Sequence, residues 1–441
     1  MSKNREPMIM TAAVMYGLGG LHDAWKVRAG EASDYMSPDY YANLARTAEA
    51  GKLHALFLAE QITNADSGTD RPSGTLDTAT VLSYMAAVTD RIGLVGTAST
   101  TYNEPFEIAR RFGTLDHLSR GRAGWNSVTT AHAGTALQFG DTELPDAEAR
   151  YSRADEFMDI VIKLWDSWEE GALVGDKVNG IFADPAKVHD INHAGAHFSV
   201  KGPLPFARTP QGRPVIFQAG SSERGRDQAA RVADVVFTAQ HTTEGAREFR
   251  ADIRRRAEAY GRSPNSIKVL PGMSVILGAT EQEAWDRKKI LHETVPMSKH
   301  LSGLSRWTGL PVDALELDKP LRVDLLSSDE DFKGGVGWRR SIVNLALKDN
   351  LTVRELIEKA PTAHFQVVGT AAQVADAMEE RLDAGAADGF TLMVPILPEG
   401  LDAVVEMLVP ELQERGLFHH EYEHDTLRGS LGLQLPDLVT V

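Results

Sequence analysis

Two adjacent serines stand where an apolar segment gives way to a helical pattern, in the stretch Gln218-Ala-Gly-Ser-Ser-Glu-Arg-Gly225. Glycine lets the backbone turn closely after the apolar segment 214–219, and the free N–H groups of a following helix point back toward that turn. The hydroxyls of Ser221 and Ser222 add further donors for an anion. The pattern favours a phosphate-binding loop, although a serine that only caps the helix has the same signature.

Three histidines at intervals of four form a second candidate site: His189, His193 and His197. On a helix this spacing suits a metal ion, and barrel hydrolases use such ligands. The intervening Asn192 and Gly195 instead favour a hairpin, which scatters side chains that are four residues apart. We therefore expect surface histidines and no metal centre. A metal-dependent barrel hydrolase is the alternative, and metal analysis of the purified protein would reveal it.

Composition and missing motifs exclude several classes of protein. The 441 residues include no cysteine, which rules out disulfides, thiolate nucleophiles, Cys-ligated zinc and iron–sulfur clusters. The P-loop motif, the dinucleotide-binding glycine motif and the serine-hydrolase elbow are all missing from the sequence. A formal charge of −16 without a basic cluster argues against nucleic acid or an anionic membrane as a partner.

Apolar segments alternate with amphipathic helical patterns along most of the chain. Eight segments have the pattern of β-strands: 8–15, 54–59, 92–98, 122–126, 214–219, 235–238, 269–277 and 390–395. Because most of them are followed by a helical pattern, the sequence predicts a parallel sheet, and eight such units predict a closed (β/α)₈ TIM barrel. An open, doubly wound sheet is the main alternative, since periodicity alone does not distinguish the two.

The chain is much longer than the roughly 250 residues of a plain barrel. Two stretches break the alternation, 128–213 and 280–364, and we interpret both as insertions in one domain that spans 1–441. The strongest helical pattern covers 151–168. Glycines interrupt the apolar run 8–21, so we interpret it as a first strand instead of a secretion signal. No other segment is apolar and long enough to span a membrane, and we expect a cytoplasmic protein.

An ordered set of motifs resembles one known family. It includes Thr97-Ala-Ser-Thr-Thr-Tyr102 and the stretches 109–129, 150–157, 164–168, 201–204, 210–214, 218–222, 387–390, 409–417 and 426–433. In these motifs the chain resembles the flavin-dependent monooxygenases grouped with nitrilotriacetate monooxygenase component A and dibenzothiophene sulfone monooxygenase. This group is a branch of the bacterial-luciferase-like superfamily, and the resemblance runs essentially from end to end.

The resemblance implies a two-component enzyme. Its barrel would bind FMN in the reduced form, FMNH₂, which a separate NAD(P)H:flavin reductase supplies by diffusion. The flavin would react with O₂ to give a peroxyflavin that oxygenates a small organic substrate. The same resemblance implies a homodimer or homotetramer. A flavin-binding protein with little turnover is a further alternative, because the chain departs from the family pattern at two positions.

Individual flavin contacts follow from the same motifs. The resemblance implies that Thr97 and Asn126, at the ends of the third and fourth strands, face the isoalloxazine ring. It implies that Tyr151 binds the flavin phosphate together with Ser221 and Ser222. Thr97 and Asn126 could instead satisfy backbone groups at strand ends, and Tyr151 could pack only against the core.

The remaining candidate site residues are those at which the chain departs from the family pattern and those that could contact substrate. Glu60 stands where the family usually has an aspartate, and this keeps the carboxylate as a plausible flavin contact. Ala147 replaces a histidine that the family usually has four residues before the tyrosine. His22 and Trp25 match a looser form of the family's N-terminal motif and could line the substrate pocket. The insertion 280–364 could help close that pocket and offers these contacts: Trp307, Trp338, Arg339 and Arg340.

Overall fold

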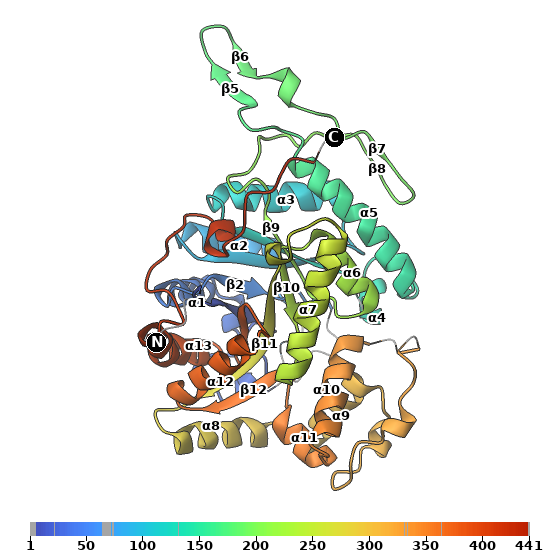
Figure 1. Ribbon diagram of the computed structural model, residues 1–441, viewed down its shortest axis with the longest axis vertical. Helices are drawn as coiled ribbons and strands as arrows, with labels where there is room; N and C mark the ends of the chain where they lie inside the picture. Colours follow the sequence, from blue (N-terminus) through green and yellow to red (C-terminus); the bar gives the residue numbers. More distant parts are fainter. Residues whose placement is uncertain are drawn as a thin grey trace.

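Eight parallel strands form a closed ring in the computed structural model, which describes residues 6–21, 23–63, 72, 75–130, 132–329, 331–332, 334–362 and 364–439 (Figure 1). In order around the ring they are β1 (Ile9–Val14), β2 (Ala55–Leu58), β3 (Gly93–Ser99), β4 (Ala123–Val128), β9 (Val215–Gln218), β10 (Val235–Thr238), β11 (Lys268–Leu277) and β13 (Gly389–Met393). The pairings of β10 with β11 and of β1 with β13 close the ring. The predicted (β/α)₈ barrel is confirmed, and the open-sheet alternative is wrong.

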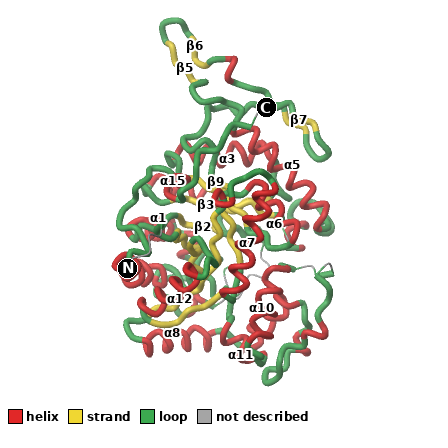
Figure 2. Tube along the Cα trace, viewed as in Figure 1, coloured by secondary structure: helices red, strands yellow, loops and turns green. Residues whose placement is uncertain are grey.

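Helices cover the outside of the strands, as Figure 2 shows. The larger ones include α1 (Pro38–Ala50), α2 (Thr78–Ala87), α3 (Pro105–Leu118), α6 (Glu223–Val232), α7 (Thr243–Ala259) and α12 (Ala371–Asp383). Short helices near the C-terminus are α13 (Glu399–Ala403), a π-helical turn (Val404–Leu408), α14 (Val409–Glu414) and α15 (Leu427–Ser430). Within the described ranges, no helix combines the length and the apolar character that crossing a bilayer requires.

The longest helix, α5 (Ala147–Trp165), begins earlier than the sequence predicted. The carboxylate of Asp146 caps it by accepting the N–H of Ala149 at 2.8 Å. Its first turn is largely exposed and has no large apolar side chain, so the apolar periodicity begins only after the helix has started. The predicted range 151–168 was therefore about one turn late at both ends.

Strand side chains alternate between the barrel interior and the layer under the helices. The interior holds large apolar groups such as Phe57, Phe217 and Phe237. The outer layer contains Trp125 and Trp165, whose ring centroids lie 6.1 Å apart. The lower part of the barrel is thus filled, and polar side chains are left for its carboxyl-terminal mouth.

In both predicted insertions, 128–213 and 280–364, the chain leaves the ring of strands and later returns to it. Between β4 and β9 the chain forms α4 (Ala133–Ala136), α5 and two hairpins, β5 (Leu173–Asp176) with β6 (Ile181–Ala183) and β7 (His193–Ala194) with β8 (Ser199–Val200). After β11 it forms α8 (Glu281–Thr294), α9 (Met297–Thr308), α10 (Val336–Lys348) and α11 (Val353–Lys359). The hairpins and these helices lie at opposite ends of the view in Figure 1. Helices α9 to α11 also share an apolar cluster of their own.

Strand β11 extends beyond the ring. Its first half pairs with β10 and β13, and residues from Met273 onward pair with a ninth strand, β12 (Phe365–Gly369). The sequence did not predict β12, because it is five residues long and leads directly into the capped helix α12. The β11–β12 pair raises one wall of the barrel mouth above the others.

Candidate active site

Thr97 and Asn126 are register neighbours on β3 and β4. The Asn126 Nδ2 donates to Thr97 Oγ1 at 3.0 Å. Asn126 is only 3% exposed and Thr97 only 6%. The Asn126 Oδ1 is buried and has no hydrogen-bond partner among the described residues. A buried acceptor left unpaired costs about 1–3 kcal/mol, so this atom marks a place where a ligand donor would be stabilising.

The predicted phosphate loop lies between β9 and α6. Ser222 caps α6 by accepting the N–H of Gly225 at 3.1 Å, and the Tyr151 hydroxyl lies 3.2 Å from Ser222 Oγ. The Ser221 Oγ lies 3.4 Å from Thr238 Oγ1 at the end of β10. The helix-cap interpretation is therefore correct, and the same geometry places a helix N-terminus, which is suited to an anion, beside four hydroxyl groups.

The insertion contributes a direct neighbour to this loop. A Cβ added at Gly337, in the first turn of α10, would lie 2.1 Å from the Cβ of Ser221. The sequence pattern points to the neighbouring Trp338, Arg339 and Arg340, and it gives no signal for this glycine. Both arginines form ion pairs with Asp329, and the Trp338 side chain is 42% exposed. The close approach at residue 337 thus joins the insertion to the candidate phosphate site.

Glu60 follows β2 at the same end of the barrel. Burial and, to a smaller extent, nearby Asp77 raise the pKa of its carboxyl to about 7, although Arg111 opposes them. A carboxyl with this pKa carries a proton for part of the time at neutral pH, so it can donate a hydrogen bond as well as accept one. The added methylene relative to aspartate therefore leaves a functional group in the site.

Glu60→Gln should change stability in a pH-dependent way. Because the folded chain holds this proton more tightly than the unfolded chain, Glu60 costs stability increasingly as pH rises from 4.5 to about 7. At 1.36 kcal/mol per pKa unit, the free energy of unfolding of the variant should exceed that of wild type by up to about 3 kcal/mol at high pH. Near pH 5 the two values should differ little. Chemical denaturation at the two pH values measures the difference. The exposed Glu143→Gln is the control, and an equal gain for both variants at high pH would contradict this assignment.

The two candidate substrate residues have different outcomes. His22 lies outside the described residues. Trp25 is half-buried in a short 3₁₀ turn (Ala24–Lys26) and packs against the outer apolar layer, with the Lys26 ammonium 5.8 Å from its ring centroid. The contact with the outer layer is a structural role for Trp25, and its place in a substrate pocket stays a prediction.

The three spaced histidines lie on and beside the hairpin β7–β8, as expected, and each has its own partner. His189 contacts Glu169 at 2.7 Å, His193 contacts Glu156 at 2.9 Å, and His197 contacts Ser152 at 2.9 Å. The imidazoles therefore do not converge. Within the described ranges, no cluster of three or more His, Asp or Glu side chains has a geometry suited to a metal ion. The hydrolase alternative has no structural support here.

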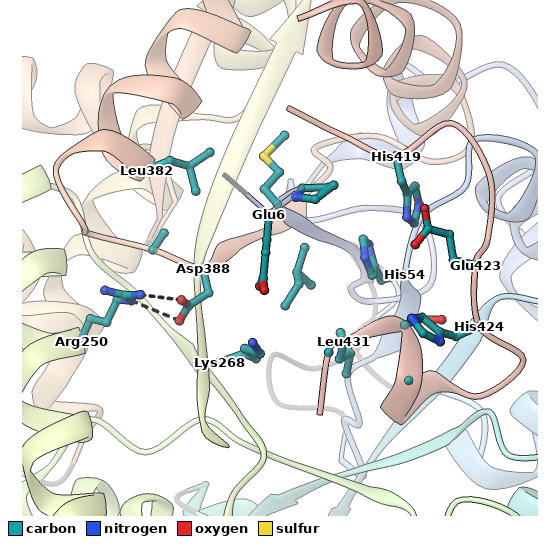
Figure 3. Close-up of a pocket in the computed structure, with 17 residues that line it drawn as sticks. Glu6, His54, Arg250, Lys268, Leu382, Asp388, His419, Glu423, His424 and Leu431 are labelled. Atoms are coloured by element: carbon teal, nitrogen blue, oxygen red, sulfur yellow. Dashed lines mark hydrogen bonds and ion pairs between the residues drawn. The ribbon is translucent and has the colours of Figure 1, made fainter. Parts of the chain in front are cut away.

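A cavity of about 520 Å³ opens at the opposite, amino-terminal end of the barrel. Figure 3 shows the Arg250 and Asp388 side chains pointing toward one another across its edge, at 2.6 Å, while Lys268, His54 and His419 lie around it. Burial lowers the pKa of His54 to about 3, and its ring stacks on His419. Because barrel enzymes place their chemistry at the other face, we assign this cavity no catalytic role.

The family model described as luciferase-like monooxygenase matches residues 20–388 of the chain. The chain belongs to the luciferase-like monooxygenase family. N-acetyl-S-(2-succino)cysteine monooxygenase of Bacillus subtilis is 43% identical over 437 residues, which cover 98% of each chain. Nitrilotriacetate monooxygenase component A of Aminobacter aminovorans is 42% identical over 443 residues and 97% of each chain. The resemblance seen in the sequence motifs is thereby confirmed.

The solved structures include one with a flavin bound. A riboflavin lyase with modified FMN and riboflavin superposes on 98% of this luciferase-like monooxygenase and 97% of that chain, with a TM-score of 0.82 and 32% identity. The chain is accordingly a flavin-dependent monooxygenase, and its relatives are of the two-component type. Asn126 Oδ1, Tyr151 and the capped loop at Ser222 are chemically suited to hold such a cofactor.

Proposed function

We propose that this chain is the oxygenase component of a two-component system that oxygenates a small organic substrate. A separate NAD(P)H:flavin reductase would supply FMNH₂ by diffusion. The bound flavin and O₂ would form a peroxyflavin, one oxygen atom would enter the substrate, and the other would leave as water while the flavin is oxidised to FMN. The chain itself would supply position, polarity and exclusion of water.

The unpaired Asn126 Oδ1 is the single observation that carries this proposal. It is buried at the barrel mouth, where an N–H of the isoalloxazine ring could donate to it. The Tyr151–Ser222 pair at the start of α6 supports FMN in particular, since hydroxyls at a helix N-terminus suit the phosphate that riboflavin lacks. Thr97 would hold the Asn126 amide so that its oxygen faces the ring.

We also propose a cytoplasmic homodimer or homotetramer built from a single domain with two insertions. The hairpin β5–β6 projects away from the barrel in Figure 1. Its Val178 is 94% exposed and Phe182 is 71% exposed. Apolar side chains on a projecting arm favour burial against a second copy of the chain, because closed symmetric oligomers are the common solution for such surfaces.

The purified protein should be nearly colourless and should bind FMNH₂ more tightly than oxidised FMN. A flavin that shuttles between two proteins must leave after each turnover, so oxidised FMN should be lost on dialysis. Absorbance after dialysis and an anaerobic FMNH₂ titration measure both quantities. With a flavin reductase, NADH and isotopically labelled O₂, mass spectrometry of a substrate panel should find one labelled oxygen in the product. Tight, stoichiometric yellow FMN contradicts the two-component scheme, and binding without product favours the low-turnover alternative.

Ala147→His should raise FMNH₂ affinity or shift substrate preference. Ala147 is exposed at the start of α5 and lies four residues before Tyr151, on the same helix face. Helix propensity differs by less than about 1 kcal/mol between the two residues, so stability should change little. Ala149→His, exposed on another face of the same turn, is the control. If Ala147→His leaves FMNH₂ titrations and turnover of the panel unchanged, residue 147 lies outside the site.

A further inference from the structure

The wall formed by β11 and β12 carries a second group of buried polar atoms. Ser274 and Gln366 are register neighbours on these strands, so their side chains lie on the same face. Ser274 Oγ and Gln366 Oε1 are both buried and have no hydrogen-bond partner in the described part of the chain. The Nδ1 of His364, two residues before Gln366, is also buried without a partner there. Buried polar groups are nearly always paired, so three together indicate a missing ligand.

His364 occupies the barrel interior because Gly272 leaves space for it. A Cβ added at Gly272 would lie 2.3 Å from the His364 Nδ1, and the imidazole centroid lies 5.2 Å from that of the interior Phe237 ring. The residue is 6% exposed, and burial lowers the pKa of His364 to about 3. Its imidazole is therefore neutral near pH 7 and can offer one donor and one acceptor. The inner end of this wall therefore presents hydrogen-bonding groups that carry no charge.

The outer end of the same wall carries a positive charge. Gln366 lines a small cleft together with Lys288 and His292 of α8. The Lys288 ammonium lies 4.8 Å from the ring centroid of Trp285 and forms no ion pair within the described residues. Burial lowers the pKa of Lys288, while Glu358 raises it. The Nδ1 of His292 is buried and, among described groups, unpaired. The Glu358 carboxylate therefore acts on this ammonium without a direct ion pair, and a half-buried ammonium with no directly bound carboxylate has room for an anionic ligand.

We propose that Ser274, His364, Gln366 and Lys288 form a substrate subsite for a small carboxylate that also bears an amide or hydroxyl group. The carboxylate would meet Lys288, and the uncharged polar group would meet the other three side chains. Strands β3 and β11 are four steps apart in either direction around the ring, so this subsite lies across the mouth from Thr97, a candidate contact of the flavin ring. The inference rests on the proposed function, because it assigns the flavin and the substrate to separate sides of one mouth.

N-acetylmethionine and its methyl ester are suitable probes, since both carry an amide and a thioether and only the acid carries a carboxylate. Calorimetry should find the acid bound about tenfold more tightly than the ester, by the flavin-free protein and by the anaerobic FMNH₂ complex. Lys288→Met should abolish this preference. Lys289→Met, whose side chain is 69% exposed on the same helix, should retain it. If the ester binds wild type as tightly as the acid does, the proposal is overturned. It is also overturned if both lysine variants lose the preference for the acid to the same extent.

The inner end is tested separately with Ser274→Ala combined with Gln366→Met. This variant should bind the acid and the ester each about tenfold more weakly and keep the ratio between them. Because it removes unpaired buried polar atoms, the ligand-free variant should unfold at a temperature no lower than wild type, and its FMNH₂ titration should match that of wild type. These two results separate lost contacts from misfolding. If neither probe binds while FMNH₂ does, the subsite is wrong and the proposed function stands. If the acid preference persists without FMNH₂ binding, the proposed function fails and the subsite stands.

Discussion

Replacing Ser221 and Ser222 together by alanine is expected to lower FMNH₂ affinity about a hundredfold or more. Each hydroxyl would donate to the flavin phosphate, and hydrogen bonds to charged groups contribute about 1.5–3 kcal/mol, with about 1.4 kcal/mol per tenfold in affinity. Reduced riboflavin, which has no phosphate, should distinguish wild type from the variant far less. Anaerobic titrations with the two flavins measure this difference directly.

Ser222 also caps α6, and removing a cap costs about 1 kcal/mol of stability. Thr370→Ala controls for that loss, because Thr370 caps α12 through the N–H of Gln373 and lies on a different helix. The control should lower stability by a similar amount and leave both flavin affinities unchanged. If the double variant loses affinity for FMNH₂ and for reduced riboflavin equally, the phosphate binds in another part of the mouth.

Gly337→Ala should reduce FMNH₂ affinity by at least about tenfold, although alanine is favoured over glycine in a helix by about 1 kcal/mol. The new Cβ would lie 2.1 Å from the Cβ of Ser221, so α10 and the phosphate loop must move apart. Neither atom is at the end of a flexible side chain, and the displacement therefore reaches the backbone that positions the hydroxyls. Anaerobic titration and thermal unfolding should both report a loss.

Gly303→Ala provides the matched control for this substitution. Gly303 lies within α9, and a Cβ added there meets no atom within 4 Å. This variant should become more stable by up to about 1 kcal/mol and bind flavin normally. If Gly337→Ala behaves in the same way, the insertion does not support the phosphate loop.

The barrel could be predicted because each of its strands is a short, buried apolar segment followed by a helix. Periodicity alone does not show whether the sheet closes into a ring. The closed barrel was predicted because the sequence contains eight strand–helix units. The contact between Thr97 and Asn126 is a matter of register between β3 and β4, which local sequence patterns do not encode. Family motifs supplied those two residues, and physical reasoning supplied only Ser221 and Ser222.

The residues that were missed share one property: their importance depends on what surrounds them. Ser274 and Gln366 resemble ordinary strand residues until their burial and lack of partners are known. Gly272 and Gly337 look like two glycines among 38, and only the approach of His364 and Ser221 gives them a function. Arg339 and Arg340 share one ion-pair partner, Asp329, which the sequence pattern did not indicate.

The pairing of the first barrel strand with the last has a consequence for synthesis on the ribosome. Thr11 of β1 bonds to Thr391 of β13 at 2.9 Å, across 380 residues. Every candidate flavin residue precedes residue 223, so all of them emerge while the ring is still open. Until β13 is made, the nascent chain carries unpaired strand edges that invite aggregation, and closure over so long a separation is slow. We therefore expect folding in the cell to depend on chaperones that shield β1 until the last strand arrives.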